Sequence, residues 1–403
     1  MKLQYRSAYR GLPREVYFLF AAKLVNCAGM FISPLLTLIL TQKLAMSKAD
    51  AGGMVAFFLL TQAPCVILGG RLADTIGRKK TFAAGSLLGA LAYIACGCGA
   101  AGRPMVYLMI LAADMVAVAA PSFDAMTADF TPPEQRQRAF SLLYLGINIG
   151  MAASPILGGL LFQNHLRLLF FFDAATTVTS VAIILWGVGE PHRGAAVSGP
   201  APAQRRSSLA SALRAAPVLL GFVLLMFCYD FCYSQWNFML PAQFGDLFGP
   251  GGARLFSLLG SANAVTVILL TPLVTLLTRR MRPLAAVAAG GLLFAAAFLG
   301  FAAGGPYPLY LLYAEVFTLG EICTTIQIGA FLSNHAPADC LGRVSAFSSI
   351  VRGTGAALGP MVMGGALGLW EYRSCWLWVL ALMLAGSLGM FLLGRRDTSP
   401  RGA

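Results

Sequence analysis

Twelve apolar segments, each of about 20 residues or more, constrain the fold of this chain more than any other feature of its sequence. Each segment is long enough to cross the hydrocarbon layer of a bilayer, which is roughly 30 Å thick. We expect them near residues 15–42, 50–71, 81–100, 105–128, 139–163, 168–188, 215–244, 255–278, 284–303, 307–333, 344–369 and 373–394. Because a segment in lipid must satisfy its own backbone hydrogen bonds, we predict an all-α membrane protein with twelve transmembrane helices.

The composition supports this prediction and indicates the surroundings of the protein. Hydrophobic residues make up 58% of the chain, charged residues 11%, and the mean hydropathy is +0.74, unlike a soluble domain. A net charge of +13 would suggest a nucleic-acid partner in a soluble protein. Here, however, 21 of the 29 Lys and Arg residues fall in the termini and alternate loops, and only 6 in the other loops. The positive-inside rule predicts cytoplasmic termini, a cytoplasmic (inner) membrane as the lipid partner, and no nucleic acid.

One segment of the chain recurs 205 positions later, which divides the sequence into two related halves. The repeated positions are Arg138, Gly150, Pro155 and Gly159 in the first copy and Arg343, Gly355, Pro360 and Gly364 in the second. Parallel repeats of this kind are typical of transporters whose halves rock against each other. We predict pseudo-symmetric six-helix bundles at 1–188 and 215–403. A cytoplasmic linker at 189–214, rich in Pro, Gly, Ala and Ser, would be either a flexible tether or a passive connection.

The turn between the second and third segments reads GGRLADTIGRKK. Gly70 and Gly77 permit a tight turn, and Asp74 is an anion suited to the positive end of a neighbouring helix. This spacing resembles the cytoplasmic loop signature of the major facilitator superfamily, with Thr75 where a basic residue is usual. The resemblance covers nearly the whole chain and implies the major facilitator fold, in which helices 1, 4, 7 and 10 line a central cavity.

The resemblance also implies a gate on the cytoplasmic side. In the family the loop aspartate, here Asp74, contacts the start of the eleventh helix near Arg343, and the loop arginine, here Arg78, pairs with the acid that ends the fourth helix, here Asp129. A solvated charge run is the alternative, although it does not explain the spacing of the glycines and the aspartate. The expected gating residues are Gly70, Asp74, Gly77, Arg78, Asp129, Arg138 and Arg343.

The fifth segment resembles the helix 5 signature of drug:proton antiporters, with Ser154 where glycine is usual. Glycine and proline let a neighbouring helix pack closely and let the axis bend, which suits a hinge, but generic small-residue packing explains the pattern equally well. The expected hinge residues are Gly150, Pro155, Gly159, Gly355, Pro360 and Gly364.

Ionisable residues inside the segments point to function, because each costs about 2.5–3.5 kcal/mol at a helix centre on insertion scales. In the seventh segment Asp230, Tyr233, Ser234 and Asn237 are spaced to share one helix face. In the tenth, Glu321 is favoured over Glu315, which points about 120° away. The expected proton-coupling residues are Asp230, Glu321, Glu315 and Asp124, with Asp230 and Glu321 foremost, because a buried carboxyl can exchange a proton near neutral pH. Structural ion pairs with Lys23 or Arg352, and snorkelling of Asp124, are the alternatives.

Polar and aromatic residues of the cavity helices are the candidates for binding a substrate. They are Lys23, Asn26, Asp114, Tyr229, Tyr233, Gln235, Trp236, Asn237 and Arg352. Drug:proton antiporters carry an arginine in helix 4 and often an acid in helix 1, whereas this chain has Asp114 and Lys23 there. Lys23 could neutralise an anionic or zwitterionic substrate, or hold an acid of the fourth segment in its charged form.

These patterns predict a secondary active transporter that moves a small organic solute by alternating access. The sequence has no phosphate loop, catalytic triad spacing or metal cluster, so we expect no enzyme activity, cofactor or metal. The prediction is proton-coupled efflux of amphipathic compounds by a monomer, as in the multidrug efflux branch that the chain resembles. The alternatives are a proton-coupled uptake symporter for a sugar, amino acid or peptide, and a non-transporting membrane receptor.

Overall fold

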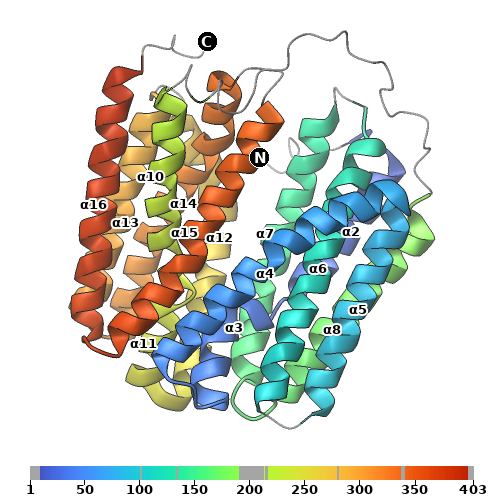
Figure 1. Cartoon of the computed structure of the whole chain (residues 1–403), viewed down its shortest axis with the longest axis horizontal. Coiled ribbons are helices and arrows are strands. Elements are labelled where there is room, and N and C mark those ends of the chain that lie inside the picture. Colours follow the sequence, from blue (N-terminus) through green and yellow to red (C-terminus); the bar gives the residue numbers. More distant parts are fainter. Residues whose placement is uncertain are drawn as a thin grey trace. The chain divides into compact units, whose positions relative to one another are not determined.

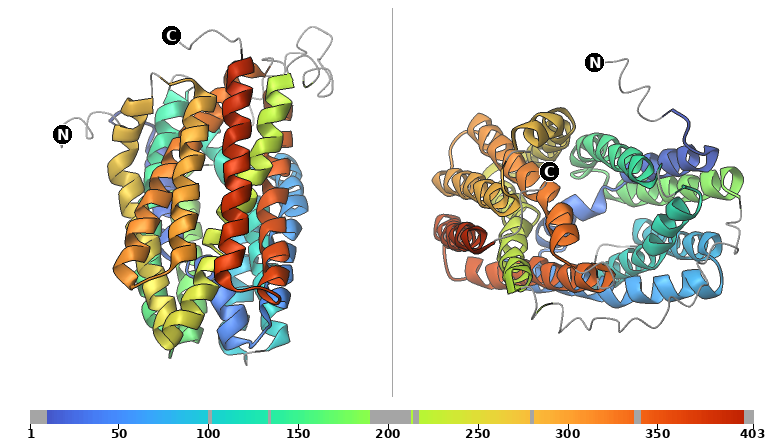
Figure 2. Two further views of the ribbon diagram at one scale, coloured as in Figure 1. Left: turned by 90° about the vertical axis from the view of Figure 1, so that its left-hand side faces the viewer. Right: turned by 90° about the horizontal axis from the view of Figure 1, so that it is seen from above.

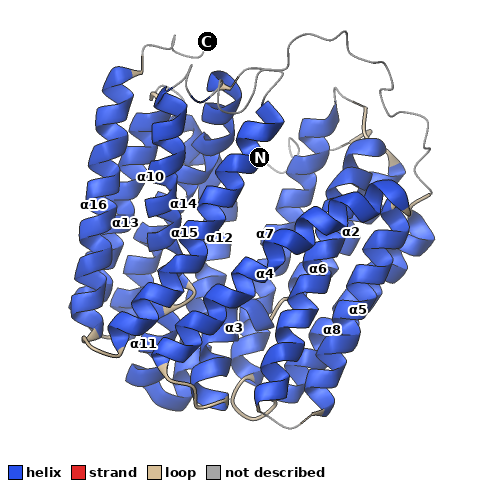
Figure 3. Ribbon diagram, in the orientation of Figure 1, coloured by secondary structure: helices blue, strands red, loops and turns tan. Residues whose placement is uncertain are grey.

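A computed structural model of the chain describes residues 10–99, 102–132, 135–189, 213, 217–278, 281–336 and 341–397. Throughout these ranges the secondary structure is helical, with no strand (Figure 3). The predicted all-α class is therefore confirmed for the part of the chain that the structure describes.

The helices form where the apolar segments were expected, and each segment coincides within a few residues with one helix or a run of consecutive helices (Figure 1). In chain order they are α2 (Arg14–Ala28), α3 (Ile32–Leu38), the π-helical η1 (Ile39–Lys43), α4 (Lys48–Thr75), α5 (Arg78–Cys98), α6 (Arg103–Asp129), α7 (Arg136–Leu161), α8 (Leu166–Gly187), α10 (Pro217–Tyr233), the 3₁₀ turn η3 (Ser234–Trp236), α11 (Met239–Phe248), the 3₁₀ turn η4 (Gly249–Gly251), α12 (Gly252–Thr278), α13 (Pro283–Ala303), α14 (Tyr307–His335), α15 (Leu341–Leu367) and α16 (Tyr372–Arg396). Proline stands in the first two positions of α6, α13 and α14, where its missing N–H costs no helical hydrogen bond.

Ten helical stretches of the described chain are long and apolar enough to cross a membrane. One of them, Pro217–Thr278, has 62 residues and contains α10, α11 and α12, which is sufficient for two crossings at about 1.5 Å per residue. α15 has 27 residues but is not among the ten. The chain is thus a multi-pass membrane protein with ten to twelve apolar helices, in agreement with the prediction from sequence.

Contacts divide the described residues into two compact units. Unit 1 lies within Met1–Ala45, Leu60–Ser198 and Leu247–Val265, and unit 2 within Met46–Leu59, Gly199–Asp246 and Thr266–Ala403. Of the predicted linker 189–214, only Gly189 and Leu213 are described, so the predicted domain boundaries stay a prediction.

The two units repeat the same pattern of helix contacts. In unit 1, α2 packs against α7 and α8, and α5 packs against α6 and α8; in unit 2, α10 packs against α15 and α16, and α13 packs against α14 and α16. The helices of each unit run side by side for most of their length (Figure 2). Gly150 of α7 fits against Cys27 and Ala28 of α2, and Gly355 of α15 fits against the backbone of Phe227 in α10. The repeated residues therefore mark the same helix crossing in each unit.

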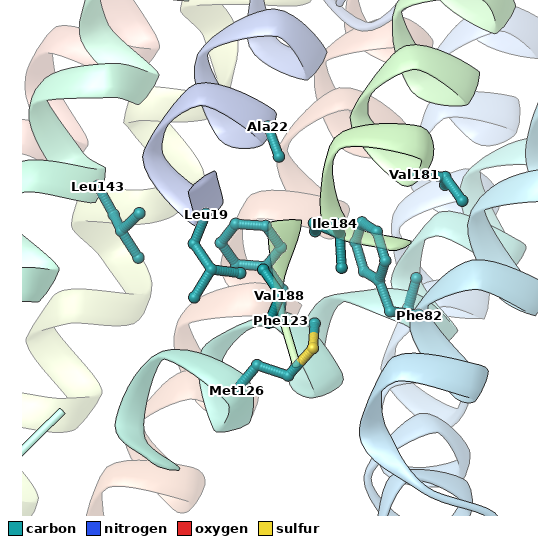
Figure 4. Close-up of a cluster of buried hydrophobic side chains, with 10 residues drawn as sticks. Leu19, Ala22, Phe82, Phe123, Met126, Leu143, Val181, Ile184 and Val188 are labelled. Atoms are coloured by element: carbon teal, nitrogen blue, oxygen red, sulfur yellow. The ribbon is translucent and has the colours of Figure 1, made fainter. Parts of the chain in front are cut away.

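A cluster of buried hydrophobic side chains forms the core of unit 1 (Figure 4). Leu19 and Ala22 of α2 meet Phe123 and Met126 of α6, and Phe82 of α5 packs on Phe123 with ring centroids 5.6 Å apart. This packing fixes α2 against α6, and it thereby positions the polar residues that follow Ala22 on the first helix.

Candidate functional site

A cavity of about 190 Å³ lies inside unit 2, where α10, α13, α14 and α15 meet. Its lining residues are Met226, Tyr229, Asp230, Tyr233, Phe294, Glu321, Thr324, Thr325, Ile328 and Arg352. Five of the residues predicted for substrate or proton binding therefore line a single cavity. Two carboxyls and one guanidinium provide its charge, and two tyrosines and a phenylalanine provide aromatic surface.

Asp230 and Arg352 form a bidentate ion pair in this cavity. Nε of Arg352 donates to Oδ2 of Asp230 at 2.7 Å, and Nη2 donates to Oδ1 at 3.0 Å. The Asp230 side chain is 16% exposed and that of Arg352 is 31% exposed, so the pair is mostly shielded and joins α10 to α15. This is the structural ion pair with Arg352 that the sequence left open as an alternative. Binding a proton or a substrate anion would compete with it.

Glu321 of α14 lies across the same cavity and accepts a hydrogen bond at Oε1 from the hydroxyl of Tyr233, at 2.8 Å. The Tyr233 ring stacks on Phe317 with centroids 5.4 Å apart, and Phe317 stacks in turn on Trp236 at 4.6 Å. The aromatic stack holds the phenol in place, so its hydroxyl is directed at the carboxyl. The arrangement places a hydrogen-bonded acid beside aromatic faces, as an amphipathic ligand would require.

Glu315 also lies on α14, but it is not part of the cavity lining. The six-residue separation from Glu321 rotates it away, as the helical period predicts. Glu321 therefore lines the cavity inside unit 2, while the preference for Glu321 over Glu315 in the predicted central cavity, and the roles of both residues in proton coupling, stay a proposal.

The predicted polar face of the seventh segment does not continue beyond Tyr233, because α10 ends there and a 3₁₀ turn follows. Ser234 is buried and donates to the Phe231 carbonyl at 2.7 Å, whereas Asn237 is exposed. The expectation that Ser234 and Asn237 share a helix face with Asp230 was therefore wrong. A change of helix type alters the angle between successive side chains, and the spacing rule assumed one continuous α-helix.

Three further candidates of this segment are held inside unit 2. Gln235 is buried and its Nε2 donates to the Phe231 carbonyl at 2.9 Å, Trp236 is 7% exposed, and the Tyr229 hydroxyl donates to the Val287 carbonyl at 3.2 Å. Of these, Tyr229 alone lines the cavity. Their positions favour support of the site, and a role in substrate binding stays a proposal.

Lys23 of α2 and Asp124 of α6 carry opposite charges within unit 1. Nζ of Lys23 is 5.1 Å from the centroid of the Phe123 ring, and it interacts electrostatically with the Asp124 carboxyl. This geometry supports the second of the two interpretations of Lys23, in which the lysine compensates an acid of the fourth segment.

Asn26 and Asp114 have different surroundings. Asn26 donates through Nδ2 to the Thr177 hydroxyl of α8 at 3.2 Å, which ties α2 to α8. Asp114 hydrogen-bonds to Thr61 of α4, and its Oδ1 is buried without a hydrogen-bond partner in the described part of the chain. Asp114 stands ten residues before Asp124, about 15 Å along α6, so it does not share a site with Lys23.

The loop motif of unit 1 contains the ion pair that the family resemblance implies. Arg78, the first residue of α5, pairs with Asp129, the last residue of α6, and its Nη1 also donates to the Ala125 carbonyl at 3.0 Å. Gly77 precedes α5 with φ of 106°, a conformation that favours glycine. The pairing is confirmed, and its role as a gate stays a proposal.

The other predicted gating residues are placed as follows. Asp74 is exposed near the end of α4, and an added Cβ at Gly70 would meet nothing within 4 Å. Nη2 of Arg138 donates to the Arg10 carbonyl at 3.0 Å. Arg343 stands at the start of α15, and its side chain lies outside the described residues. The contact between Asp74 and the start of the eleventh helix therefore stays a prediction.

The last repeated glycine is a close-contact point in each unit. A Cβ added at Gly159 of α7 would lie 2.7 Å from Cβ of Ser257 in α12, and one added at Gly364 of α15 would lie 3.0 Å from Cα of Gly52 in α4. Pro155 lies inside α7 and Pro360 inside α15. The glycines permit tight helix packing, and their action as hinges stays a proposal.

Several lining residues were not named from the sequence. Met226, Phe294, Thr324 and Ile328 contribute to the cavity wall. Thr324 could have been recognised by its place three residues after Glu321 on the same helix. The apolar residues carry no sequence signal that separates a cavity wall from ordinary packing.

Comparison with known proteins bears on the family and the fold of the chain. The sequence model of the Major Facilitator Superfamily matches residues 18–360. The chain is 23% identical over 398 residues to the uncharacterized MFS-type transporter YttB of Bacillus subtilis (strain 168), covering 97% of this chain and 98% of that one. It is 26% identical over 395 residues to the multidrug resistance protein MdtH of Edwardsiella ictaluri (strain 93-146), covering 94% and 92%. A crystal structure of an auto inhibited POT family peptide transporter matches with a TM-score of 0.78 at 18% identity, over 96% and 98% of the two chains, and shows the shared fold.

Proposed function

The chain belongs to the Major Facilitator Superfamily and is a membrane transporter, and from this premise we propose that it exports small amphipathic compounds in exchange for protons. The proposal includes alternating access, a monomer in a cytoplasmic (inner) membrane, and both termini in the cytoplasm. The observation that carries it is the unit 2 cavity, in which Glu321 and the Asp230–Arg352 pair lie among aromatic side chains.

The lining favours a lipophilic cation as the substrate. Its ionisable residues are two acids and one base, and Asp230 and Arg352 compensate each other at 2.7 Å. Glu321 lies in the same lining beside the rings of Tyr233 and Phe294, and we place the cationic substrate there. Aromatic faces attract cations by about 0.5–2 kcal/mol, the larger values where water is excluded.

Competition for Glu321 would couple the two fluxes. A proton that binds its carboxyl removes the negative charge that holds the cation, and loss of that proton restores it. Asp230 would contribute differently, because protonation there weakens the bidentate contact with Arg352, which is one of the links between α10 and α15. The multidrug resistance proteins among the relatives support export as the direction.

A vesicle assay tests the direction and the coupling. Inside-out membrane vesicles that contain the protein are energised with an acidic lumen, and the probes are tetraphenylphosphonium as cation and calcein as anion. The proposal predicts accumulation of the cation that collapses when a protonophore is added. Accumulation in right-side-out vesicles instead would show uptake with protons. Absence of counterflow for every solute that stabilises the purified protein would favour a receptor.

A further inference from the structure

The first membrane helix is broken in its middle, and the break is buried. α2 ends at Ala28 and α3 begins at Ile32, while Phe31 and Ile32 are 3% and 1% exposed. The first N–H groups of a helix have no partner within it, and in a buried place each needs another acceptor. Phe31 occupies the N-cap position of α3, but its side chain contains no hydrogen-bonding atom.

The missing acceptor comes from a different helix. Asp173 of α8 is 5% exposed, and its carboxyl accepts hydrogen bonds from the backbone N–H groups of Ile32 and Phe31. The Phe31 N–H is also 2.9 Å from the Gly29 carbonyl oxygen, so the Ile32 N–H depends most on Asp173. Pro34, in the same turn of α3, has no N–H to satisfy. A single carboxyl thus caps the outer piece of the first helix.

Contacts with α7 and α8 hold the chain in place around the break. Gly29 packs on Thr176 so closely that an added Cβ would overlap that side chain, and Thr177 accepts the hydrogen bond from Asn26. The Ser154 hydroxyl of α7 donates to the Met30 carbonyl at 3.4 Å. Asp173, Thr176 and Thr177 occupy one turn of α8, so this turn holds both sides of the break.

We propose that Asp173 is a positioning residue. By capping α3 it keeps the first membrane helix interrupted at Gly29–Phe31, and it thereby directs Lys23 toward Asp124. Lys23 stands one turn before Cys27, the last buried residue of α2, and Asn26 ties this last turn to Thr177 of α8, four residues from Asp173. The outer piece is anchored separately, because Lys43 donates to the Gln163 carbonyl at 2.8 Å. With Ile32 capped by Asp173, α3 does not have to continue the axis of α2, although α8 holds both pieces. The consequence for transport rests on the proposed function, whereas the capping itself does not.

Hydrogen exchange at the backbone amides of residues 31–32, measured on the full chain in detergent, tests the capping. Asp173→Ala removes both acceptor oxygens, and we expect exchange at Ile32 to accelerate at least tenfold, which is the effect of losing about 1.4 kcal/mol. Asp173→Asn keeps one carbonyl oxygen, and we expect a smaller acceleration of roughly threefold, of the size of one neutral hydrogen bond. The matched control is Thr179→Val, because Thr179 is exposed and its hydroxyl donates to the Ala175 carbonyl of its own helix. Exchange in the control should equal that of the parent.

Transport of tetraphenylphosphonium in the same variants tests the positioning. We expect Asp173→Asn to lower the maximal rate severalfold at an unchanged half-saturating concentration, since the unit 2 cavity is not altered. Unchanged exchange at Ile32 in folded Asp173→Asn would overturn the inference. A loss of transport that matches only the loss of folded protein would also overturn it. If the parent moves no solute at all, the proposed function fails, but the exchange experiment still decides whether Asp173 caps the break.

Discussion

Asp230 and Arg352 are 122 positions apart in the chain and meet through two hydrogen bonds, of 2.7 and 3.0 Å, within one cavity. The pair joins α10 to α15, the helix that carries the second copy of the repeat. It also compensates one of the two acids of the cavity, and Glu321 is the acid that we propose to meet the substrate.

Loss of one partner of the pair should destabilise the protein more than loss of both. Asp230→Asn or Arg352→Gln alone should lower the free energy of unfolding by about 2–3 kcal/mol, less than for a fully buried pair because Arg352 is 31% exposed. The double variant should cost less than the sum of the single variants, since neither charge is then left alone. Unfolding in detergent gives the three values. Additive losses would show that the two groups do not interact in solution.

Swapping the charges of Arg78 and Asp129 should show whether the pair affects the stability of the protein, its rate of transport, or both. Arg78 starts α5 and Asp129 ends α6, so each charge faces the unfavourable end of its own helix dipole, at a cost of about 0.3–1 kcal/mol each. Arg78→Asp combined with Asp129→Arg keeps the pair and reverses this cost. We expect the melting temperature to be equal or slightly higher, but transport to be slower because the donor to the Ala125 carbonyl is lost.

The control for this variant is Lys80→Gln, which removes an exposed cation from the same turn. It should transport at the parent rate, because a solvated surface charge contributes little to stability. If the charge-swapped protein also transports at the parent rate, the Arg78–Asp129 pair is structural and does not gate the protein.

Two adjacent glycines of α15 should respond differently to alanine. At Gly364 the new methyl group would meet Cα of Gly52 at 3.0 Å, whereas at Gly365 nothing lies within 4 Å. Gly364→Ala should therefore destabilise the protein by about 1–3 kcal/mol, as overpacking does. Gly365→Ala should be neutral or stabilise by up to about 1 kcal/mol, because alanine favours the helix. Thermal unfolding monitored by tryptophan fluorescence measures both, and equal effects would contradict the packing at Gly364.

Much of the fold could be predicted from the sequence because apolar length and repeated glycines are local signals. Gly150 and Gly355 were matched by spacing alone, and both proved to be contact points of equivalent helices. The interruption of the first helix at Gly29–Phe31 could not be predicted, because its cap is Asp173 on a helix far along the chain. The hydropathy of residues 15–42 predicts one continuous apolar segment.

The site was predictable in its residue types and less so in its pairings. Asp230 and Glu321 were selected because charge is costly in lipid, and both line the cavity. Which partner each would take depends on side chains brought together by the tertiary fold, so the choice between Lys23 and Arg352 had to wait for the structure. The face expected for Ser234 and Asn237 failed because the change to a 3₁₀ turn at Ser234 has no distinct sequence signal.

The proposed transport mechanism depends most on the carboxyl of Glu321, and the most direct measurement is proton-driven accumulation of tetraphenylphosphonium in inside-out vesicles by Glu321→Gln. Glu371→Gln is the matched control, since it makes the same change at an exposed glutamate that precedes α16. We predict that Glu321→Gln abolishes accumulation against a gradient while retaining part of the solute exchange, and that Glu371→Gln accumulates the cation as the parent does. Undiminished uphill accumulation by Glu321→Gln would contradict the mechanism.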